Sequence, residues 1–246
     1  MHSVAKLCLA IPGALAALAM ALFAAPAQAN LVQNGSFEVV TATITSVFSA
    51  GGVANWSNSP PFLEGEAIVL PSWFTNGCLF CPNVGVAGPL PQYSPDGGNW
   101  VFSDGNFMNS PITQTITGLV PGNFYQLSFY QGLVQDTEPN VTTPGPVTGS
   151  WIVSLGSSVW NSAPMAADGS IPTISNWALQ TVALKAQNAT EVLSFLSVGT
   201  GDPPLVLLDG VNLTEVPEPT SAALLALGFV GLGAVYRRTR WQRIAG

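Results

Sequence analysis

Glycine and proline are spread through the middle of this chain at a density that long helices do not tolerate. The 246 residues include 25 glycines and 20 prolines, and residues 30–215 contain no extended apolar stripe with a period of 3.6. Short runs rich in Val, Ile, Thr and aromatic residues alternate there with turn-forming clusters. This pattern predicts an all-β fold in which about ten short strands form a single β-sandwich.

The expected strands are runs in which apolar and polar side chains alternate or β-branched and aromatic residues cluster. They cover residues 36–40, 44–48, 67–70, 99–103, 112–117, 125–131, 150–155, 179–184, 191–198 and 206–214. Loops of unusual length, which are uncommon unless they have a function or lack order, are expected at residues 71–98, 136–149 and 156–176.

The first 29 residues have the pattern of a signal peptide. Lys6 precedes an apolar stretch at residues 7–25, and Ala27-Gln28-Ala29 is a small-x-small cleavage site. The alternative, a first transmembrane helix, is disfavoured because a proline and a glycine interrupt the apolar stretch. We therefore expect signal peptidase to remove residues 1–29, so that the exported chain begins at Asn30.

A second apolar segment lies near the C-terminus. Residues 220–236 contain no charged side chain, and a helix of this length would extend about 25 Å, close to the ~30 Å of a bilayer core. Basic residues directly after a membrane segment favour a cytoplasmic location for that end. The segment is therefore predicted to be a short transmembrane helix, held by Arg237, Arg238, Arg240 and Arg243.

A short motif of four residues precedes this segment: Val216, Pro217, Glu218 and Pro219. In order and spacing, the motif, the apolar segment and the arginines resemble the PEP-CTERM sorting signal of Gram-negative bacteria. The same tail is also called the ice-binding protein C-terminal domain, a name that implies no activity. The resemblance implies that an exosortase, a membrane protease, recognises and cuts the tail at the inner membrane, and that the protein then reaches the cell surface or extracellular matrix. The alternative is a plain anchor that is never cut.

These features divide the chain into three parts. Residues 1–29 are the expected signal peptide, residues 30–215 the expected ectodomain, and residues 216–246 the expected sorting signal. Residues 30–218 contain one lysine, Lys185, and all thirteen carboxylates of the chain, so their formal net charge is −12. Such a domain cannot neutralise a phosphate backbone, which excludes nucleic-acid binding. The acidity would attract cations, or it serves only to keep an exported protein soluble.

Histidine and cysteine limit the chemistry of the exported chain. His2 is the single histidine, and it leaves with the signal peptide, so no imidazole remains for a catalytic triad or a zinc site. Cys78 and Cys81 form a Cys-Leu-Phe-Cys motif. In a reducing compartment this spacing would indicate a redox motif or half of a zinc site. In an exported chain it favours a short disulfide that stiffens a local loop.

Three stretches of the ectodomain form a recognisable series: residues 30–38 (NLVQNGSFE), 116–129 (ITGLVPGNFYQLSF) and 207–213 (LLDGVNL). In this order they resemble the start, middle and end of galactose-binding-like jelly rolls, which include many carbohydrate-binding modules. The resemblance implies a single jelly-roll sandwich in which the first and last strands come close, often joined by a structural calcium. Glu38 and Asp209 match its carboxylate ligands, although Gly210 stands where the family has a second acidic residue. The alternative is that both are ordinary surface groups.

The first of these stretches also predicts a local structure. Asn34-Gly35 indicates a tight turn in which the glycine takes a positive φ. Phe37 is expected to enter the core after this turn, and Glu38 to emerge at the start of a strand.

Aromatic residues in expected loops are candidates for stacking on sugar rings. Trp73, Tyr93 and Trp160 are the candidate glycan contacts, with packing against the core as the alternative for each. Three other tryptophans lie in or beside expected strands and are predicted to be core residues: Trp100, Trp151 and Trp177.

An enzyme without histidine would depend on a pair of carboxylates, as glycoside hydrolases do. The pairs that lie close in sequence are Glu64 with Glu66, Asp96 with Asp104, and Asp136 with Glu138, and nothing in their context favours one of them. The sequence therefore predicts a non-catalytic exported protein of the cell surface or of an exopolysaccharide or biofilm matrix. A carbohydrate-binding module for a surface or matrix glycan is the alternative, and a carboxylate-based glycoside hydrolase is a minor one.

Overall fold

The computed structural model describes residues 29–40, 53–58, 67–69, 85–86, 94–106, 110–137, 145–168, 177–201 and 204–217, together with Gly228 and Gly231, which are helical. The chain divides into two compact units, Ala29–Val216 and a second unit made of Met1–Gln28 with Pro217–Gly246. Within the residues just given, no helix is long and apolar enough to cross a membrane. The expected signal helix and transmembrane helix lie almost wholly outside the described residues.

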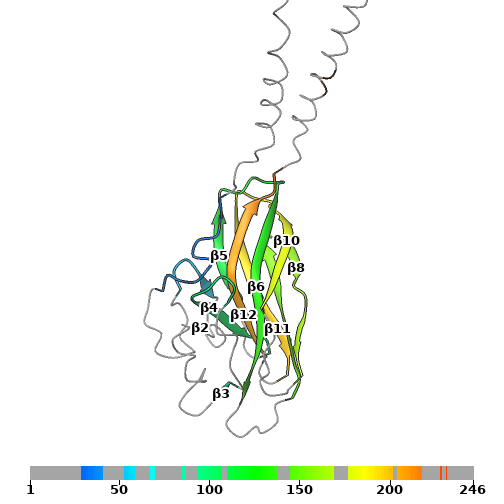
Figure 1. Cartoon of the computed structure of the whole chain (residues 1–246). Coiled ribbons are helices and arrows are strands. Elements are labelled where there is room, and N and C mark those ends of the chain that lie inside the picture. Colours follow the sequence, from blue (N-terminus) through cyan, green and yellow to red (C-terminus); the bar gives the residue numbers. More distant parts are fainter. Residues whose placement is uncertain are drawn as a thin grey trace, which may run out of the picture. The chain divides into compact units, whose positions relative to one another are not determined.

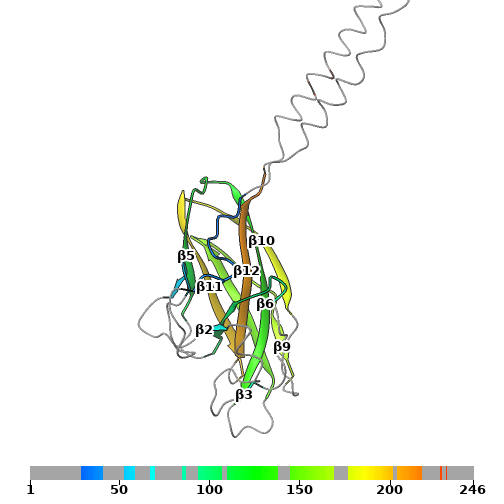
Figure 2. The same ribbon diagram turned by 60° about the vertical axis from the view of Figure 1, so that its left-hand side comes forward.

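The described part of Ala29–Val216 forms two antiparallel sheets of six strands each (Figures 1 and 2). The first, here the β5 sheet, has the order β1 (Ser57–Asn58), β5 (Ile112–Thr117), β11 (Thr190–Thr200), β7 (Val147–Leu155) and β8 (Ser158–Asn161), with β9 (Met165–Ala167) also on β7. The second, here the β6 sheet, has the order β10 (Ala178–Lys185), β6 (Phe124–Thr137), β12 (Pro204–Glu215), β4 (Trp100–Asp104) and β2 (Ala67–Val69), with β3 (Gly85–Val86) on β6.

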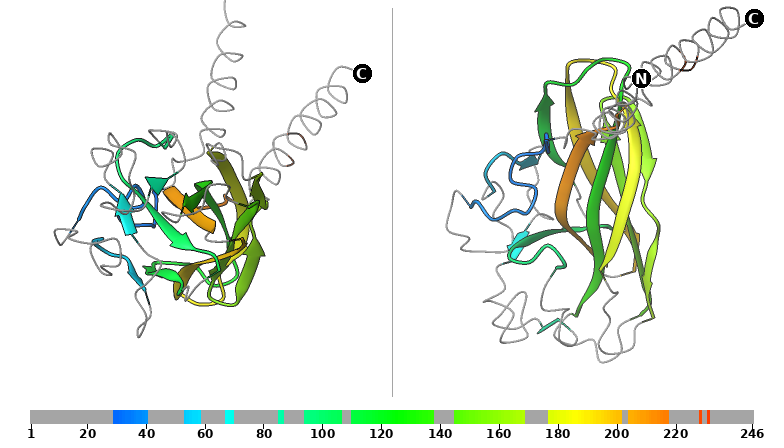
Figure 3. Two further views of the ribbon diagram at one scale, coloured as in Figure 1. Left: turned by 90° about the horizontal axis from the view of Figure 1, so that it is seen from below. Right: turned by 45° about the horizontal axis from the view of Figure 1, so that its top comes forward.

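Strands that follow one another in sequence alternate between the two sheets. From β4 to β7, and again from β10 to β12, each strand lies in the sheet opposite its predecessor. The two facing layers can be followed in the left panel of Figure 3, where the sandwich is seen from below. The prediction of a single all-β jelly-roll sandwich is confirmed.

The core lies between the sheets and follows the period-two pattern of the strands. In β7 the side chains of Trp151, Val153 and Leu155 are fully buried, whereas the residues between them are half-buried on the outer face. Phe195 of β11 packs edge-on against Phe129, with ring centroids 5.2 Å apart, and against Trp151 at 6.1 Å. The contact with Phe129 of β6 crosses between the two sheets, whereas the contact with Trp151 of β7 lies within the β5 sheet.

The N-terminal segment of the sandwich, residues 29–40, is hydrogen-bonded to the last strand, β12. The Leu31 N–H donates to the Leu213 carbonyl and the Val211 N–H donates to the Gly35 carbonyl, each at 2.9 Å. A β-bulge between Asp209 and Asn212 shifts the register of β12 against β6. Gly210, at φ 58°, supplies the extra residue. The bulge lets Leu208, Val211 and Leu213 all face the core.

The strand predictions are confirmed over most of the sandwich but are wrong at two places. Residues 112–117 form β5 with the predicted bounds. Residues 36–40 form no strand, because positive φ at Asn34 and Phe37 turns the chain, leaving only an isolated bridge from Val40 to Val53. The expected loop 156–176 contains β8 and β9, since Gly156 at φ 55° closes a tight hairpin after β7.

Two smaller differences concern the other expected loops. β6 runs to Thr137 and β7 begins at Val147, so the expected loop 136–149 is shorter at both ends. β3 lies within the expected loop 71–98. The expected strand 44–48 lies outside the described residues.

The turn at Asn34-Gly35 forms, but its glycine has a different role from the predicted one. The positive φ of 52° belongs to Asn34, and Gly35 has none. A Cβ on Gly35 would lie 2.0 Å from the Val211 carbonyl oxygen. The glycine is therefore needed for the close approach of the N-terminal segment to β12 rather than for an unusual backbone angle.

Candidate cation site

Asp209 lies in the middle of β12, in register with Tyr130 of β6. Its side chain is 0% exposed, and neither carboxylate oxygen has a hydrogen bond of ordinary geometry. A buried, unpaired carboxylate is costly because it has lost its hydration without gaining a partner. On the described part of β12, Asp209 is the residue whose buried side-chain oxygens lack partners.

Burial raises the pKa of Asp209 from 3.8 to about 8. The hydroxyl of Ser94 and the N–H of Gly210 lie close enough to lower this pKa in part, and the negative charges of Asp96 and Glu38 raise it further. The group is therefore held largely neutral at pH 7 in the absence of a cation. A cation would reverse this balance by favouring the charged form.

Glu38 is positioned by the turn that precedes it. The Asn34 side chain donates to the carbonyls of Val39 and Ala54, each at 3.0 Å, and accepts from the Val39 N–H at 2.9 Å. The Glu38 Oε1 atom accepts from the Asn99 N–H at 2.5 Å. These contacts fasten the Glu38 carboxylate to the segment that leads into β4.

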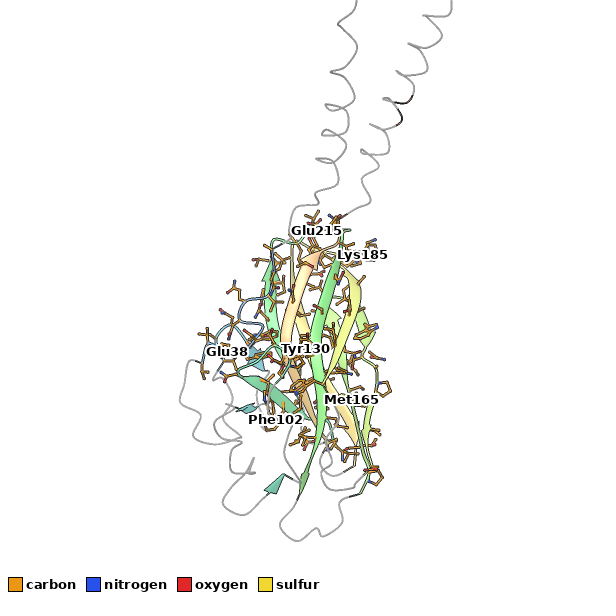
Figure 4. All side chains as sticks on the ribbon, in the orientation of Figure 1. Glu38, Phe102, Tyr130, Met165, Lys185 and Glu215 are labelled. Carbon is orange, nitrogen blue, oxygen red and sulfur yellow. The ribbon has the colours of Figure 1, made fainter. Side chains whose placement is uncertain are left out.

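Two glycines leave room for this arrangement. A Cβ on Gly98 would lie 1.8 Å from the Glu38 Oε1 atom, and a Cβ on Gly210 would lie 3.2 Å from the Cβ of Asp96. Asp96 therefore packs against the bulge of β12. Figure 4 shows Glu38 and Tyr130 on the same part of the sandwich, where the N-terminal segment meets the β6 sheet.

The structure places two carboxylates, Glu38 and Asp96, near enough to Asp209 for their charges to raise its pKa, and sequence reasoning had associated only Glu38 with it. Glu38 and Asp209 were paired through the family resemblance, whereas Asp96 was paired with Asp104 as a possible catalytic couple. Asp104 ends β4, and its carboxylate accepts from the Asn106 N–H at 2.8 Å. No signal in the sequence places Asp96 beside Asp209, because this depends on the bulge and on the loop at residues 94–99.

Lys185 is too far along the sheet to neutralise this site. It pairs with Phe124 in register, whereas Asp209 pairs with Tyr130. Phe124 and Tyr130 are six steps apart along β6, which corresponds to about 20 Å. Lys185 is also the sole basic residue between residues 30 and 217, so the acidic site has no cationic side chain of the ectodomain beside it.

These residues fit a hard cation better than a catalytic role. Calcium is held by carboxylates and backbone carbonyls, and the two unpartnered oxygens of Asp209 are suited to it. Across the described ranges, no three His, Cys, Asp or Glu side chains already converge as a metal site, so backbone oxygens would have to complete the shell. A fully buried Asp209 cannot contact a polysaccharide substrate.

The candidate glycan contacts occupy different environments. Trp160 of β8 is half-buried against the core, and its ring meets Phe129 edge-on at 6.4 Å. Trp73 and Tyr93 lie outside the described residues. The same holds for Cys78 and Cys81, whose disulfide stays a prediction, and for Glu64, Glu66 and Glu138.

The other tryptophans lie on both sides of the β6 sheet. Trp151 is a core residue, and its indole N–H donates to the Leu207 carbonyl at 3.1 Å. Trp100 is also buried, but its neighbour Val101 belongs to the core, so Trp100 faces away from the β5 sheet. There it meets Trp177 edge-on at 6.0 Å. The prediction of buried positions is confirmed for Trp151 and Trp100, although Trp100 lies outside the cluster between the sheets. Trp177 is only half-buried.

The outer face of the β6 sheet carries a polar strip that sequence reasoning did not select. Neighbouring residues of β10, β6 and β12 form two rows of it in register, and each side chain of the strip is exposed or half-buried. The ring of Tyr130 lies at one end, in a row with Leu179, which is 57% exposed, and with the buried Asp209. The strip consists of Gln126, Ser128, Tyr130, Thr181, Asn212 and Thr214. The period-two pattern of residues 125–131 was the available signal.

Two sequence comparisons bear on the C-terminus and on the chain as a whole. Residues 215–238 match the PEP-CTERM protein-sorting motif, so the predicted sorting motif is confirmed. It indicates a protein that is exported and sorted to the cell surface. No curated protein sequence matches the chain.

Several solved structures are similar to this chain in fold. The carbohydrate-binding module TmCBM61, solved with β-1,4-galactotriose, has 14% identity and a TM-score of 0.42, covering 76% of this chain and 99% of that chain. A protein assigned as sugar-binding from Bacteroides thetaiotaomicron has 13% identity and a TM-score of 0.37, covering 76% and 100%. The K1 adhesin domain of Lys-gingipain from Porphyromonas gingivalis has 14% identity and a TM-score of 0.39, covering 70% and 96%. At TM-scores below 0.5, the sugars named for these proteins say nothing about the ligand of this chain.

Proposed function

We propose that the protein is a non-catalytic component of the cell surface or of an exopolysaccharide or biofilm matrix of a Gram-negative bacterium. In this proposal an exosortase at the inner membrane cuts the ectodomain from its C-terminal tail. The observation that carries it is the sorting motif at residues 215–238, which follows a folded sandwich that ends at Val216. The domain and the signal for its delivery are thus joined directly.

Removal of residues 1–29 by signal peptidase is part of the proposal. Its support is the role of Asn30, whose side chain accepts from the N–H groups of Val32 and Leu213 at 2.9 Å. The Asn30 side-chain amide also contacts the Val211 carbonyl at 3.4 Å. The first residue of the expected mature chain is therefore already an ordered part of the sandwich.

Mass spectrometry of the protein from cells and medium tests both cuts. We expect a mature form that begins at Asn30 and ends shortly after Val216. Deletion of residues 220–246 should release the ectodomain without surface sorting. Recovery of residues 30–246 alone from cells that possess an exosortase would contradict the proposal and leave a plain anchor.

A second candidate function is recognition of a surface or matrix glycan. The observation that favours it is the polar strip on the outer face of the β6 sheet, where a tyrosine ring lies at the end of a run of hydroxyl and amide groups. Sugars are commonly bound by such a combination of an aromatic platform and hydrogen-bonding side chains. In this proposal Tyr130 stacks on one sugar ring, Ser128 and Asn212 bind hydroxyls next to it, and Gln126, about 13 Å further along β6, binds the next sugar.

A glycan array and a pull-down on the organism's own exopolysaccharide test this second function. Tyr130→Ala should reduce retention at least about tenfold, which corresponds to ~1.4 kcal/mol. Thr115→Ala on the outer face of the β5 sheet is the matched control and should bind like the wild type. Equal retention of both variants would remove the strip as the binding surface.

A structural calcium at Asp209 and Glu38, with Asp96 beside them, is a third element of the proposal. The ion would supply positive charge between the N-terminal segment and β12 and so hold the ends of the sandwich together. The support for it is the pair of unpartnered, buried oxygens on Asp209.

A further inference from the structure

The last strand leads into the sorting motif without a spacer. β12 ends at Glu215, the residue at which the motif match begins. Thr214 and Glu215 are still paired in register with β6, and the Val216 N–H donates to the Phe124 carbonyl at 2.8 Å. Pro217 has no N–H to donate, so the hydrogen-bonded structure reaches the first proline of the motif.

Two turns hold this end of the strand in place. The Asn123 side-chain amide donates to the Glu215 Oε1 atom at 2.5 Å. The Gly122 N–H donates to the Ala186 carbonyl at 2.8 Å, and the Ala186 N–H donates to the Asn123 carbonyl at 3.0 Å. We call residues 118–124, 185–189 and 215–216 the tail pole, since they form one hydrogen-bonded unit from which the tail begins.

The tail pole carries two exposed apolar side chains and the one lysine of the ectodomain, beside its own half-buried Glu215. Val120 is 48% exposed and Phe124 is 51% exposed. The Lys185 Nζ atom lies 5.9 Å from the centre of the Phe124 ring, within range of a cation–π interaction. Figure 4 shows Glu215 and Lys185 together at this end of the sandwich. The single base between residues 30 and 217 is thus beside the start of the motif.

A protease that reads residues 216–219 has to hold them extended, with residues on both sides of the cut bond in its cleft. Because residues 214–216 are fixed to β6, the enzyme meets the folded tail pole together with the peptide. We propose that the tail pole is a docking surface for the membrane protease that cuts the sorting motif. Val120 and Phe124 provide apolar contact and Lys185 pairs with an acidic group of the enzyme.

This inference rests on the proposed processing, and it makes the folded domain part of the substrate. The motif alone would be a poorer substrate than the motif attached to the pole. Continuity between the pole and the motif identifies the protease as the occupant of the surface, rather than a lipid surface or a second copy of the chain.

The first test separates the pole from the motif in the full-length chain. Six residues, Gly-Ser-Gly-Ser-Gly-Ser, are inserted between Val216 and Pro217, and conversion of uncut to cut protein is followed by pulse-chase in cells that possess the protease. We expect cutting to slow roughly tenfold, the effect of losing ~1.4 kcal/mol of interaction. Cutting at the original rate, or faster, would overturn the inference.

The second test changes the surface and leaves the peptide intact. The double variant Val120→Ser with Phe124→Ser, and the single variant Lys185→Gln, should each be cut more slowly. The matched control is Val159→Ser with Val192→Ser, two residues that are 64% and 46% exposed on the β5 sheet. Limited proteolysis of each full-length variant checks that it folds.

The two tests together identify the partner. If the surface variants are slow but the insertion is cut normally, the surface serves the membrane or another molecule, and protease docking is wrong. If the control slows as much as the surface variants, the effect is general and the inference also fails.

A motif variant, Pro217→Ala with Pro219→Ala, distinguishes this inference from the proposed function. If that variant is cut at the normal rate, the sorting proposal itself fails. If it is not cut while the insertion variant is cut normally, only the docking surface is wrong.

Discussion

The middle and the end of β12 place carboxylates in opposite situations. Asp209, in the middle, is fully buried, has no ordinary hydrogen bond, and lies beside two further carboxylates. Glu215, at the end, is half-buried and accepts from the Asn123 side chain. One strand therefore contains a strained acid that a cation would relieve and a satisfied acid that only fixes local structure. Charge alone does not distinguish them, whereas burial and hydrogen-bond partners do.

The largest effect is expected for a substitution that disrupts the contact between the N-terminal segment and the middle of β12. Gly35→Ala would place a Cβ 2.0 Å from the Val211 carbonyl oxygen, so we expect a loss of about 3 kcal/mol or more in the free energy of unfolding. Urea unfolding measures this loss. Gly122→Ala is the control at the tail pole, where a Cβ meets nothing within 4 Å and φ is 94°. It should cost only about 1–2 kcal/mol of backbone strain, and a larger loss there than at Gly35 would contradict the comparison.

The second effect is on the pH dependence of folding stability in the absence of divalent cations. The pKa of Asp209 is raised in the folded state from 3.8 to about 8, so the folded protein holds a proton that the unfolded chain releases. Its contribution to stability is fully present below about pH 4 and is lost as the pH rises through 8. Asp209→Asn should remove this slope and stabilise the protein by about 2 kcal/mol or more at pH 7.5 with chelator present. Thermal unfolding between pH 4 and 9 measures it, and identical slopes for both proteins would be the contrary result.

Calcium should reverse the order of stability of the wild type and Asp209→Asn. If the ion binds at Asp209, the wild type gains ~2.7 kcal/mol at a hundredfold excess over Kd, which raises Tm by several degrees for a domain of this size. Asp209→Asn should gain little. Magnesium at equal ionic strength is the control for diffuse screening of the acidic surface. Equal stabilisation by both ions, or an unchanged response of the variant, would mean that the acidity serves only solubility.

The smallest effect is expected at the end of the strand. Asn123→Ala removes the donor to Glu215 and should cost about 1 kcal/mol, with no dependence on calcium. Chemical unfolding with and without the ion measures this. A calcium-dependent loss would show that the end and the middle of β12 are coupled, and would weaken the distinction between them.

The strands could be predicted where apolar and polar side chains alternate clearly along the sequence. They could not be predicted where a tight turn determines the path of the backbone. Residues 112–117 alternate cleanly, and their predicted bounds are those of β5. Residues 36–40 contain strand-forming side chains, but positive φ at Asn34 and Phe37 makes a turn that composition does not reveal. β8 was missed because four residues after a tight turn give too short a pattern for periodicity.

The candidate site was predictable in part, through resemblance rather than through spacing. Glu38 and Asp209 are about 170 residues apart in sequence, and the motifs around them led to their association. Asp96 could not be added, because its place beside Asp209 depends on the bulge at Gly210 and on where residues 94–99 cross the sheet. Long-range packing of this kind leaves no periodic signal in one sequence.

The position of β12 within its sheet determines when the ectodomain can assemble. This strand is the last of the chain, yet it lies between β6 and β4, and the N-terminal segment also bonds to it. A polypeptide that is translocated from its N-terminus onward cannot close the sheet until residue 213 has emerged. Folding must therefore wait for nearly complete translocation, and long-range pairing of this kind is slow. The folded domain and the sorting motif that follows it therefore become complete at the same late stage of export.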